Sequence, residues 1–283
     1  MEIKMKNILA GVILAFLVSL VNVSYANEEI KFEVKDTPIV MVKCPAGTFV
    51  MGSLAGPLGE LGRSNGDVFN DETQHNVTIS NDFYIGKFPV TQAQYMAVMG
   101  KNPSKFQDDN NPVERVSWFM AKEFCDKLNE VTESTRLAGY RFDLPTEAQW
   151  EYACRAGTTT ALNSGKNITT TEEKVNCPNL DEVGWYESNS DGKAQPVGLK
   201  KPNAWGIYDM HGNVWEWCED WWGDYDLINL TDPIGPASGS IRVCRGGSWC
   251  YAPKVCRSAY RNGDIPERTY YDFGFRIVLV PEK

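Results

Sequence analysis

The most restrictive feature of this chain is the tryptophan-rich stretch from Asn203 to Trp222, NAWGIYDMHGNVWEWCEDWW. Four of the nine tryptophans lie between Trp215 and Trp222, with acidic residues among them. Indole rings at this density bury a large apolar surface, so the stretch predicts a tightly packed, loop-rich centre. A buried carboxylate such as Glu216 is costly unless hydrogen-bond donors or a cation meet it. Packing alone is one interpretation, and a bound hard cation such as Ca²⁺ is the other, since carboxylates and loop carbonyls suit it.

The first 26 of the 283 residues have the pattern of a secretory signal peptide. Lys4 and Lys6 precede an apolar run from Ile8 to Val23, and a small-x-small ending closes at Ala26. The apolar run is short for a full membrane span, which disfavours an uncut anchor. No cysteine stands at its end, which disfavours a lipoprotein. We therefore expect cleavage after Ala26 and an exported chain, periplasmic or secreted, without a stable transmembrane span.

The charge balance disfavours a nucleic-acid partner. The net charge is −9 and the pI about 4.9, and no cluster of lysine and arginine interrupts this acidic balance. Nothing therefore supplies the basic patch that neutralises phosphates. The even count of eight cysteines favours disulfides in an exported chain, although spacing does not give their connectivity. The sequence leaves the oligomeric state open.

Capping signals and hydrophobic periodicity predict three helices in the first half of the chain. Their N-caps are expected at Thr91, Ser117 and Thr146. Both threonines are followed three residues later by glutamine, which is the spacing of a capping box. Gly100 and Gly157 fit the ends of the first and third helices, because glycine tolerates the left-handed conformation that closes a helix.

Short strands are expected around these helices, from alternating or short apolar runs. They fall at 39–51 (two strands and a turn), 75–80, 83–90, 240–248 and 274–280. The last two are expected to pair with each other. Residues 27–37 are predicted to be a flexible leader, and 158–200 to be long loops with short strands. This pattern predicts an α+β fold with a single domain over residues 38–283.

Seven segments resemble the formylglycine-generating enzyme (sulfatase-modifying factor) family. They are PAGTFVMGS (45–53), FYIGKFPVTQAQY (83–95), NPVERVSW (111–118), LPTEAQWEYACRAG (144–157), NAWGIYDMHGNVWEW (203–217), RGGSW (245–249), and RSAYR with GFR (257–276). Any one segment is weak evidence, but seven in order along nearly the whole mature chain are hard to explain by chance. The resemblance implies a loop-rich variant of the C-type lectin-like fold, with few short helices and irregular antiparallel strands.

The resemblance also implies an activity. The enzymes of the family are copper-dependent oxidases that use O₂ to convert a cysteine of a sulfatase's Cys-x-Pro-x-Arg motif into formylglycine. Their cysteine pair follows a GGS motif with Cys-x4-Cys spacing, and two thiolates suit Cu⁺. Ser248 matches the serine of that motif, and Cys250 and Cys256 follow it. These three residues are the candidate catalytic residues, with Cu⁺ as candidate cofactor and a sulfatase as candidate substrate.

A disulfide is the alternative for the two cysteines. Five residues separate Cys250 from Cys256, and Cys250 lies one position closer to the serine than the family pattern expects. A cysteine directly before RSAYR also occurs in family members that lack the catalytic pair. The exported setting favours bridges of Cys250 and Cys256, to each other or to other cysteines, over copper binding.

The resemblance further implies two calcium sites. The residues that fall on or near them are Asp209, Gly212, Val214 and Glu216 for the second site, and Asn176, Cys177, Asp191 and Lys193 for the first. The glycine, valine, cysteine and lysine act through backbone oxygens. Mixed carboxylate and carbonyl ligation is what Ca²⁺ prefers.

Two functions of different class follow. The first is an exported oxidase of the formylglycine-generating type, or a relative that oxidises another substrate. The second is a non-catalytic C-type lectin-like protein that binds a ligand or joins an envelope assembly. Residues 250–272 favour the second, since they contain Tyr251, Tyr260, Tyr270 and Tyr271 between two expected strands.

Other chemistry is disfavoured. The chain has only two histidines, no Cys-x2-Cys pair, no GxSxG elbow and no GxxxxGK[ST] loop. Zinc, serine-hydrolase and nucleotide sites therefore lack their usual residues. A structural role is expected for both His75 and His211.

Overall fold

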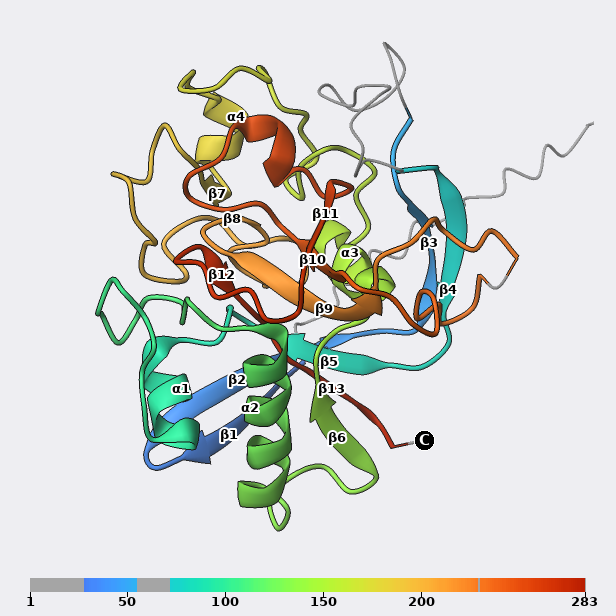
Figure 1. The fold of residues 1–283 in the computed structure, drawn as a ribbon. Helices are drawn as coiled ribbons and strands as arrows, with labels where there is room; N and C mark the ends of the chain where they lie inside the picture. The colour runs from blue at the N-terminus through green and yellow to red at the C-terminus, as the bar shows by residue number, and fades with distance from the viewer. Residues whose placement is uncertain (1–27, 55–71, 229, 283) are drawn as a thin grey trace, which may run out of the picture.

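The computed structural model describes residues 28–54, 72–228 and 230–282 (Figure 1). Its strands are β1 (Glu29–Val34), β2 (Thr37–Cys44), β3 (Gly47–Met51), β4 (His75–Ile79), β5 (Phe83–Gly86), β6 (Tyr140–Asp143), β7 (Gly184–Trp185), β8 (His211–Gly212), β9 (Trp215–Trp221), β10 (Arg242–Arg245), β11 (Arg261–Asp264), β12 (Phe273–Gly274) and β13 (Val278–Pro281). Its helices are α1 (Gln92–Met99), α2 (Trp118–Val131), α3 (Glu147–Arg155) and α4 (Pro178–Asp181), with a short 3-10 helix at Pro253–Cys256. The predicted signal peptide lies outside the described residues.

Two sheets organise these elements. The larger has the strand order β1-β2-β5-β13-β6 and is antiparallel throughout. The smaller has the order β11-β10-β9-β12, in which the pair of β9 and β12 is parallel. Helices α1 and α2 pack on the larger sheet, whereas α3 packs on β9 and β10 of the smaller one (Figure 1). The predicted α+β class is confirmed.

The three predicted helices start where their caps were expected. Thr91 and Thr146 each form a complete capping box, and the Ser117 hydroxyl accepts from the Met120 N–H. Gly100 ends α1 in the left-handed conformation, as predicted. At the end of α3, Gly157 has a φ of 92°, and Ala156 before it is also left-handed with a φ of 44°. Local hydrogen-bonding signals thus determine the helix starts.

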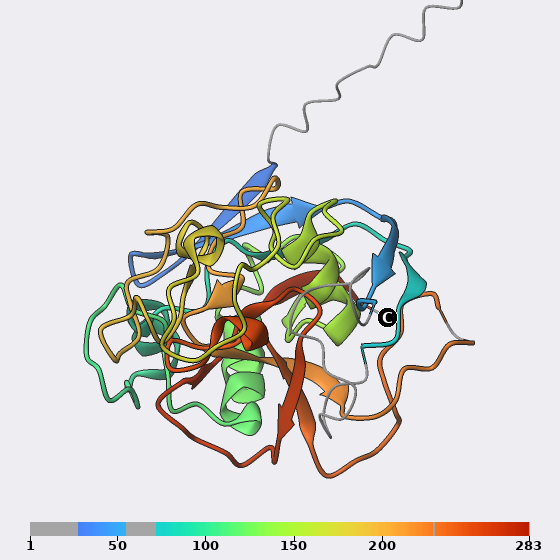
Figure 2. The same ribbon diagram turned by 90° about the horizontal axis from the view of Figure 1, so that it is seen from above.

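The segment predicted to be a flexible leader is ordered instead. Residues 29–34 form β1 and pair along their whole length with β2. This hairpin (blue) lies at the periphery in both views (Figures 1 and 2). Phe32 and Val34 of β1 are buried in the core, and they alternate with exposed charged residues. Burial of these two apolar side chains therefore orders a stretch that composition alone suggests is loose.

Two further expectations about strands are wrong. The segments at 240–248 and 274–280 do not pair with each other, because β10 lies between β9 and β11 while β13 lies between β5 and β6. Within the tryptophan-rich stretch, residues 215–221 form the strand β9 rather than a loop. This strand is buried on both faces, so the alternation of buried and exposed residues that normally identifies a strand is absent.

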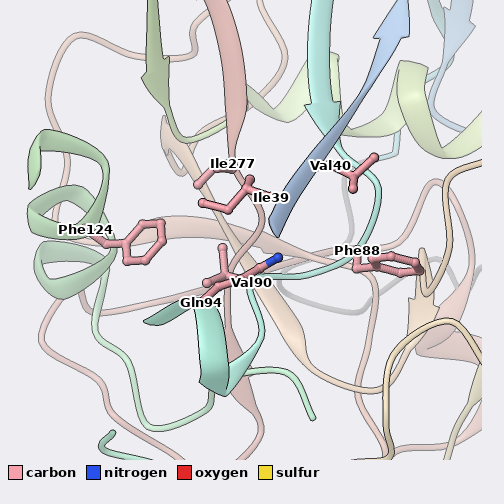
Figure 3. A pocket seen from close by; sticks show the side chains of 8 residues that line it. Ile39, Val40, Phe88, Val90, Gln94, Phe124 and Ile277 are labelled. Atoms are coloured by element: carbon pink, nitrogen blue, oxygen red, sulfur yellow. The ribbon is translucent and has the colours of Figure 1, made fainter. Parts of the chain in front are cut away.

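The core leaves little empty space between the larger sheet and α2. A cavity of about 10 Å³ lies there, between Ile39, Val90, Phe124 and Ile277 among others (Figure 3). A hole of this size holds one water at most. It is therefore a packing gap and no ligand site. In the described part of the chain, no helix combines the length and the apolar character that crossing a bilayer requires.

Gly212 in β8 gives a test of this packing. A Cβ on Gly212 would come within 1.8 Å of the Trp185 carbonyl oxygen, and its φ is 78°. Gly100 has a similar φ of 73° but open space around it. We expect Gly100→Ala to lower the free energy of unfolding by about 1 kcal/mol from backbone strain alone. Gly212→Ala should cost at least about 2 kcal/mol more, because it adds a collision. Urea unfolding measures both, and equal losses would contradict the packing of β7 on β8.

Candidate functional site

The loop after β10 carries all three candidate catalytic residues. Gly247 has a φ of 74°, which glycine adopts without strain, and turns the chain toward Ser248. A Cβ on Gly247 would come within 2.7 Å of Cys256 Sγ, so the turn lies directly on that sulfur. Cys256 is fully buried at the end of the 3-10 helix, whereas Cys250 is partly exposed. The loop thus leaves the Cys250 thiol partly exposed and covers the Cys256 thiol.

Ser248, Cys250 and Asp272 form a polar cluster. The Ser248 hydroxyl donates to Asp272 Oδ2 at 3.1 Å and lies 3.4 Å from Cys250 Sγ. The Cys250 thiol donates to the same carboxylate oxygen at 3.5 Å. The Asp272 carbonyl accepts from the Trp215 N–H, which fixes the cluster to β9. Sequence reasoning missed Asp272, whose only signal is its place directly before the Phe-Gly-Phe-Arg ending.

The surroundings of the two cysteines keep their thiols protonated. Burial raises the pKa of Cys250 to about 12, and the Asp272 carboxylate adds to the rise while the Ser248 hydroxyl opposes it. Burial also raises the pKa of Cys256, and the neighbouring Cys250 adds to it. Copper binds the thiolate form. Two protonated thiols, one of them sealed from solvent, therefore do not fit Cu⁺ in this conformation.

The eight cysteines are all free thiols in the structure, and each of them lies in a described segment. Seven are buried: Cys44, Cys125, Cys154, Cys177, Cys218, Cys244 and Cys256. The expected disulfides are therefore not formed here, and neither is a bridge between Cys250 and Cys256. The buried thiols act as small apolar side chains in the core.

Aromatic residues surround Cys250. Trp249 packs edge-on against Phe106 and at a tilt against Tyr271, with ring centroids 6.0 and 5.6 Å apart. The Lys105 ammonium lies over the Phe106 and Tyr271 rings, 4.9 and 4.8 Å from their centroids. Such contacts add cation–π attraction to the packing. A lysine therefore flanks the aromatic surface next to the exposed thiol.

Three tyrosines of the 250–272 segment reach the surface near this thiol. Tyr251, Tyr270 and Tyr271 are 41%, 49% and 42% exposed, whereas Tyr260 is less exposed and packs on Trp215. We call Trp249, Tyr251, Tyr270 and Tyr271 the aromatic rim. Tyrosine offers a large contact surface at low entropic cost, because its side chain has few rotatable bonds. The rim therefore has the composition of a recognition surface.

Glu216 already has a cation. Its two carboxylate oxygens accept from Arg276 Nε at 2.8 Å and Nη2 at 2.9 Å, and the Trp150 indole N–H donates at 2.7 Å. The partner that the tryptophan-rich stretch requires is thus a guanidinium. The oxygens of Glu216 are taken, so this residue does not fit a calcium ligand.

Asp209 fits better. One of its oxygens accepts from the Gly198 N–H at 2.7 Å, and the other is buried without a partner in the described part of the chain. Burial raises the pKa of Asp209 to about 6, with the nearby charge of Glu216 as a smaller cause. An open carboxylate oxygen suits a hard cation. Calcium thus stays a prediction at Asp209, Gly212 and Val214.

The first calcium site stays a prediction at Asn176, Cys177, Asp191 and Lys193. The Asn176 side-chain oxygen accepts from the Tyr186 hydroxyl at 3.0 Å, which also accepts from the Cys177 N–H. Asp191 and Lys193 lie on the exposed side of their loop. Across 28–54, 72–228 and 230–282, no three His, Cys, Asp or Glu side chains come together as a metal site.

A buried group of Cys154, His211 and Ser258 has the residue types of a nucleophile and its base. His211 Nδ1 lies 2.7 Å from the Cys256 carbonyl oxygen, and its Nε2 accepts from the Asn163 N–H at 3.0 Å. Burial lowers the pKa of His211 to about 4 and raises that of Cys154 to about 12. Both ring nitrogens are thus engaged and the thiol stays protonated, so the contacts of His211 are those of a structural residue.

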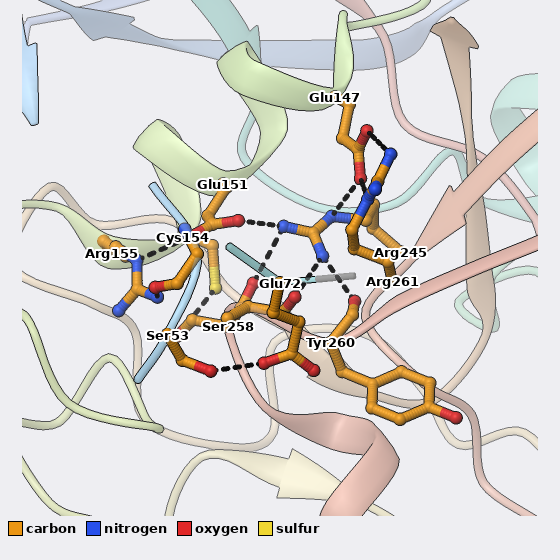
Figure 4. A network of polar contacts seen from close by, with 12 residues as sticks. Ser53, Glu72, Glu147, Glu151, Cys154, Arg155, Arg245, Ser258, Tyr260 and Arg261 are labelled. Carbon is orange, nitrogen blue, oxygen red and sulfur yellow. Dashed lines mark hydrogen bonds and ion pairs between the residues drawn. The ribbon is translucent and has the colours of Figure 1, made fainter. Parts of the chain in front are cut away.

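Buried ion pairs hold the segment that contains the candidate site. Four arginines at or near the strands β10, β11 and β13 contact four glutamates from other parts of the chain. Figure 4 shows two of these arginines, Arg245 and Arg261, beside Glu147 and Glu151 of α3. The pairs are Arg245 with Glu151, Arg257 with Glu72, Arg261 with Glu147, and Arg276 with Glu216. The candidate site therefore lies within a fixed framework.

Comparisons with known proteins show which family this chain belongs to. Residues 27–280 match the family described as the sulfatase-modifying factor enzyme 1-like domain. The chain is 34% identical over 249 residues to the chaperone protein LppX of Paenibacillus barcinonensis, covering 72% of this chain and 81% of that one. It is 36% identical over 176 residues to the formylglycine-generating enzyme of Streptomyces coelicolor, covering 59% and 52%. The chain thus spans about half the length of that enzyme.

Two solved structures share the fold. The Treponema denticola variable protein 1 has a TM-score of 0.73 and 31% identity, covering 89% of this chain and 99% of its own. PvdO from Pseudomonas aeruginosa also has a TM-score of 0.73, with 27% identity and coverage of 89% and 98%. These likenesses confirm the predicted loop-rich variant of the C-type lectin-like fold.

Alkylation tests the environment of Cys250. With iodoacetamide at pH 8, we expect slow modification of Cys250 and none of the seven buried cysteines in the native protein. Asp272→Asn removes the neighbouring negative charge, lowers the pKa of the thiol and should speed modification about tenfold, if the pKa falls by one unit. Asp36→Asn in the β1–β2 turn is the control and should change nothing. Peptide mass spectrometry measures the rates, and rapid labelling of Cys256 would contradict the cluster geometry.

Urea unfolding tests the pair of Arg276 and Glu216. Arg276→Leu leaves a buried carboxylate unpaired and should cost about 3–5 kcal/mol. The double variant Arg276→Leu/Glu216→Leu leaves no buried charge and should recover part of this loss. Arg141→Leu is the matched control, because its pair with Asp143 is partly exposed and is worth about 0–1 kcal/mol. A double variant as unstable as the single one would show that the unpaired charge is not the cause.

Proposed function

The chain belongs to the sulfatase-modifying factor enzyme 1-like family, and on this basis we propose that it is a non-catalytic member which binds a protein segment at its aromatic rim. The observation that carries the proposal is that the surroundings of Cys250 expose aromatic side chains but keep the thiols unreactive. Three tyrosines are exposed there, whereas the neighbouring thiols are protonated and one is sealed. An oxidase of the copper type needs two accessible thiolates, but a binding surface needs only shape and exposed aromatic area.

The framework of the site also suits binding. A preformed surface loses little entropy when a ligand docks, which raises affinity. The rim residues stand between Arg245 and Arg276, whose buried ion pairs fix the ends of the segment. Lys105 adds a positive charge beside Tyr271, so a partner segment with carboxylates complements the rim. One relative is named as a chaperone, a class that acts on other proteins, and we extend that kind of role to this chain.

Export and calcium are parts of the same proposal. The charged start, the apolar run and the small-x-small ending of residues 1–26 support a location outside the cytoplasm. Calcium, where bound, would be held by Asp209 with backbone oxygens of Gly212 and Val214. Its role there would be to stabilise loops, since Asp209 has no contact with the cluster of Cys250 among the contacts described.

The second candidate function is oxidation of a cysteine-containing peptide. The specific observation in its favour is the contact of the Ser248 hydroxyl with Cys250 Sγ, which places the motif serine beside an accessible thiol. For copper to bind, Cys256 would have to leave its buried position under Gly247. The oxidase function thus requires a rearranged loop.

Peptide selection tests the binding function. The protein, from residue 27 onward, is used to select binders from a displayed library of random peptides. We expect selected peptides to lose at least about tenfold in affinity with Tyr271→Ala or Tyr251→Ala, because central aromatic residues dominate such interfaces. Phe119→Ala is the matched control, since Phe119 is 51% exposed on α2, and it should leave affinity unchanged. Peptides that bind all variants equally would contradict a site at the rim.

Copper binding distinguishes the two candidates. The proposal expects no Cu⁺ binding in competition with a thiol-free chelator, and no O₂ uptake with a Cys-x-Pro-x-Arg peptide. Stoichiometric Cu⁺ that is lost in Cys250→Ser, together with O₂ uptake by the wild type, would overturn the non-catalytic assignment and establish the oxidase.

A further inference from the structure

Glu114 is a buried carboxylate that holds the turn formed by residues 104–106. It is sealed from solvent, and its Oε1 accepts from the Phe106 N–H at 2.9 Å and also from the Lys105 N–H. The backbone contributes as well, because the Glu114 N–H donates to the Ser104 hydroxyl at 3.1 Å. A single residue thus fixes the backbone of the whole turn.

A carboxylate in this position is costly for the fold. Burial raises the pKa of Glu114, and the two N–H groups of the turn and the charges of Arg115 and Lys105 oppose the rise. Its second oxygen, Oε2, is buried without a hydrogen-bond partner in the described part of the chain. An apolar side chain could fill the same space without this desolvation cost. What the carboxylate contributes is therefore its hold on the turn.

The turn carries two side chains to the aromatic rim. The Phe106 ring packs edge-on against Trp249, a residue of the rim. The Lys105 ammonium lies over the Tyr271 ring, another residue of the rim. Because both side chains leave the backbone at the turn, their positions depend on the hydrogen bonds that Glu114 accepts.

Lys105 supplies an unpaired positive charge at the rim. Among the residues that the structure describes, it forms no ion pair, although Asp108 and Asp109 are exposed in the same loop. Asp108 instead accepts from the Asn110 N–H at 2.9 Å. A chain with a net charge of −9 repels acidic partners at long range, so a segment with carboxylates needs a local cation to dock. The Lys105 ammonium is such a cation.

The residue after Glu114 connects the turn to the other side of the rim. The Arg115 N–H donates to the Tyr270 carbonyl at 3.0 Å, and the φ of Arg115 is 61°. This left-handed conformation costs a non-glycine residue free energy, so the surrounding contacts must hold it there. Residues 114 and 115 thus join the turn to the tyrosines at 270 and 271.

We propose that Glu114 is a positioning residue of the aromatic rim, which holds the Lys105 ammonium at Tyr271 so that the rim selects partner segments with carboxylates. This inference rests on the binding function proposed for the rim and adds the residue that sets its selectivity. A purely structural role would explain why Glu114 contacts the turn. It would not make the choice between acidic and neutral segments depend on Glu114.

NMR of reductively methylated lysines tests the positioning without a partner. The ring currents of Phe106 and Tyr271 should displace the Lys105 methyl signal, which Lys105→Arg identifies by its absence. We expect the displacement to persist in Glu114→Gln, which keeps an acceptor for the two N–H groups, and to vanish in Glu114→Ala. The other lysine signals show that each variant is folded. A displaced signal that remains in Glu114→Ala would overturn the role of Glu114.

Two displayed peptide libraries test the selectivity. They are random except for a fixed central pair, Asp-Asp in one and Asn-Asn in the other. We expect the wild type to enrich the acidic library at least about threefold over the neutral one, as an exposed charge pair allows, and less so at high salt. Lys105→Gln and Glu114→Ala should abolish this preference, and Glu114→Gln should keep it. Lys35→Gln removes an exposed charge from the β1–β2 turn and is the matched control.

The outcomes separate this inference from the function on which it rests. Equal enrichment of both libraries that Tyr271→Ala abolishes would overturn the selectivity and leave the binding function in place. Enrichment of neither library would overturn the binding function, and this inference with it. A preference that survives Lys105→Gln would place the selecting charge elsewhere and would also overturn the proposal.

Discussion

Buried pairs of guanidinium and carboxylate are the interaction on which the rest of the structure depends. Arg245, Arg257, Arg261 and Arg276 are essentially sealed from solvent. Moving a charge of this kind out of water costs several kcal/mol unless a well-placed partner and further hydrogen bonds offset it. Arg276 shows how complete the compensation is, because it also donates to the Gly86 and Tyr208 carbonyls. These pairs are satisfied only when distant parts of the chain have come together, so they favour one arrangement over loosely packed alternatives.

All four arginines come from one segment, residues 245–276, and their glutamates come from elsewhere. Glu147 and Glu151 belong to α3, and Glu216 belongs to β9. Glu72 lies in the chain shortly before β4 begins at His75. The segment is therefore fastened at four points along its length. Between these points it carries the exposed tyrosines, whose side chains contribute less to the core. This division separates the residues that hold the loop from those that can contact a partner.

The sequence predicts the local parts of this structure better than the distant ones. Thr91, Ser117 and Thr146 cap their helices through hydrogen bonds to residues within one turn, so the signal is contained in a few positions. Strand β9 escapes prediction because both of its faces are buried, and its pairing with β12 depends on a contact some 58 positions along the chain, between Trp215 and Phe273. The need of Glu216 for a cation was predictable, but its identity as Arg276 was not. The same applies to Asp272, which becomes a neighbour of Cys250 only through the fold.

The four ion pairs that hold residues 245–276 also affect the chemistry at Cys250. Along the chain, Cys256 lies between Arg245 and Arg257, which both form buried ion pairs, and Gly247 packs directly against its sulfur. To expose that sulfur, the loop must move away from Gly247 while Arg257, the next residue, stays bonded to Glu72 through two hydrogen bonds of 2.9 and 2.7 Å. Breaking such a buried pair is costly, since it leaves an uncompensated charge. The buried ion pairs that fix the segment carrying the aromatic rim thus also keep the second thiol away from solvent.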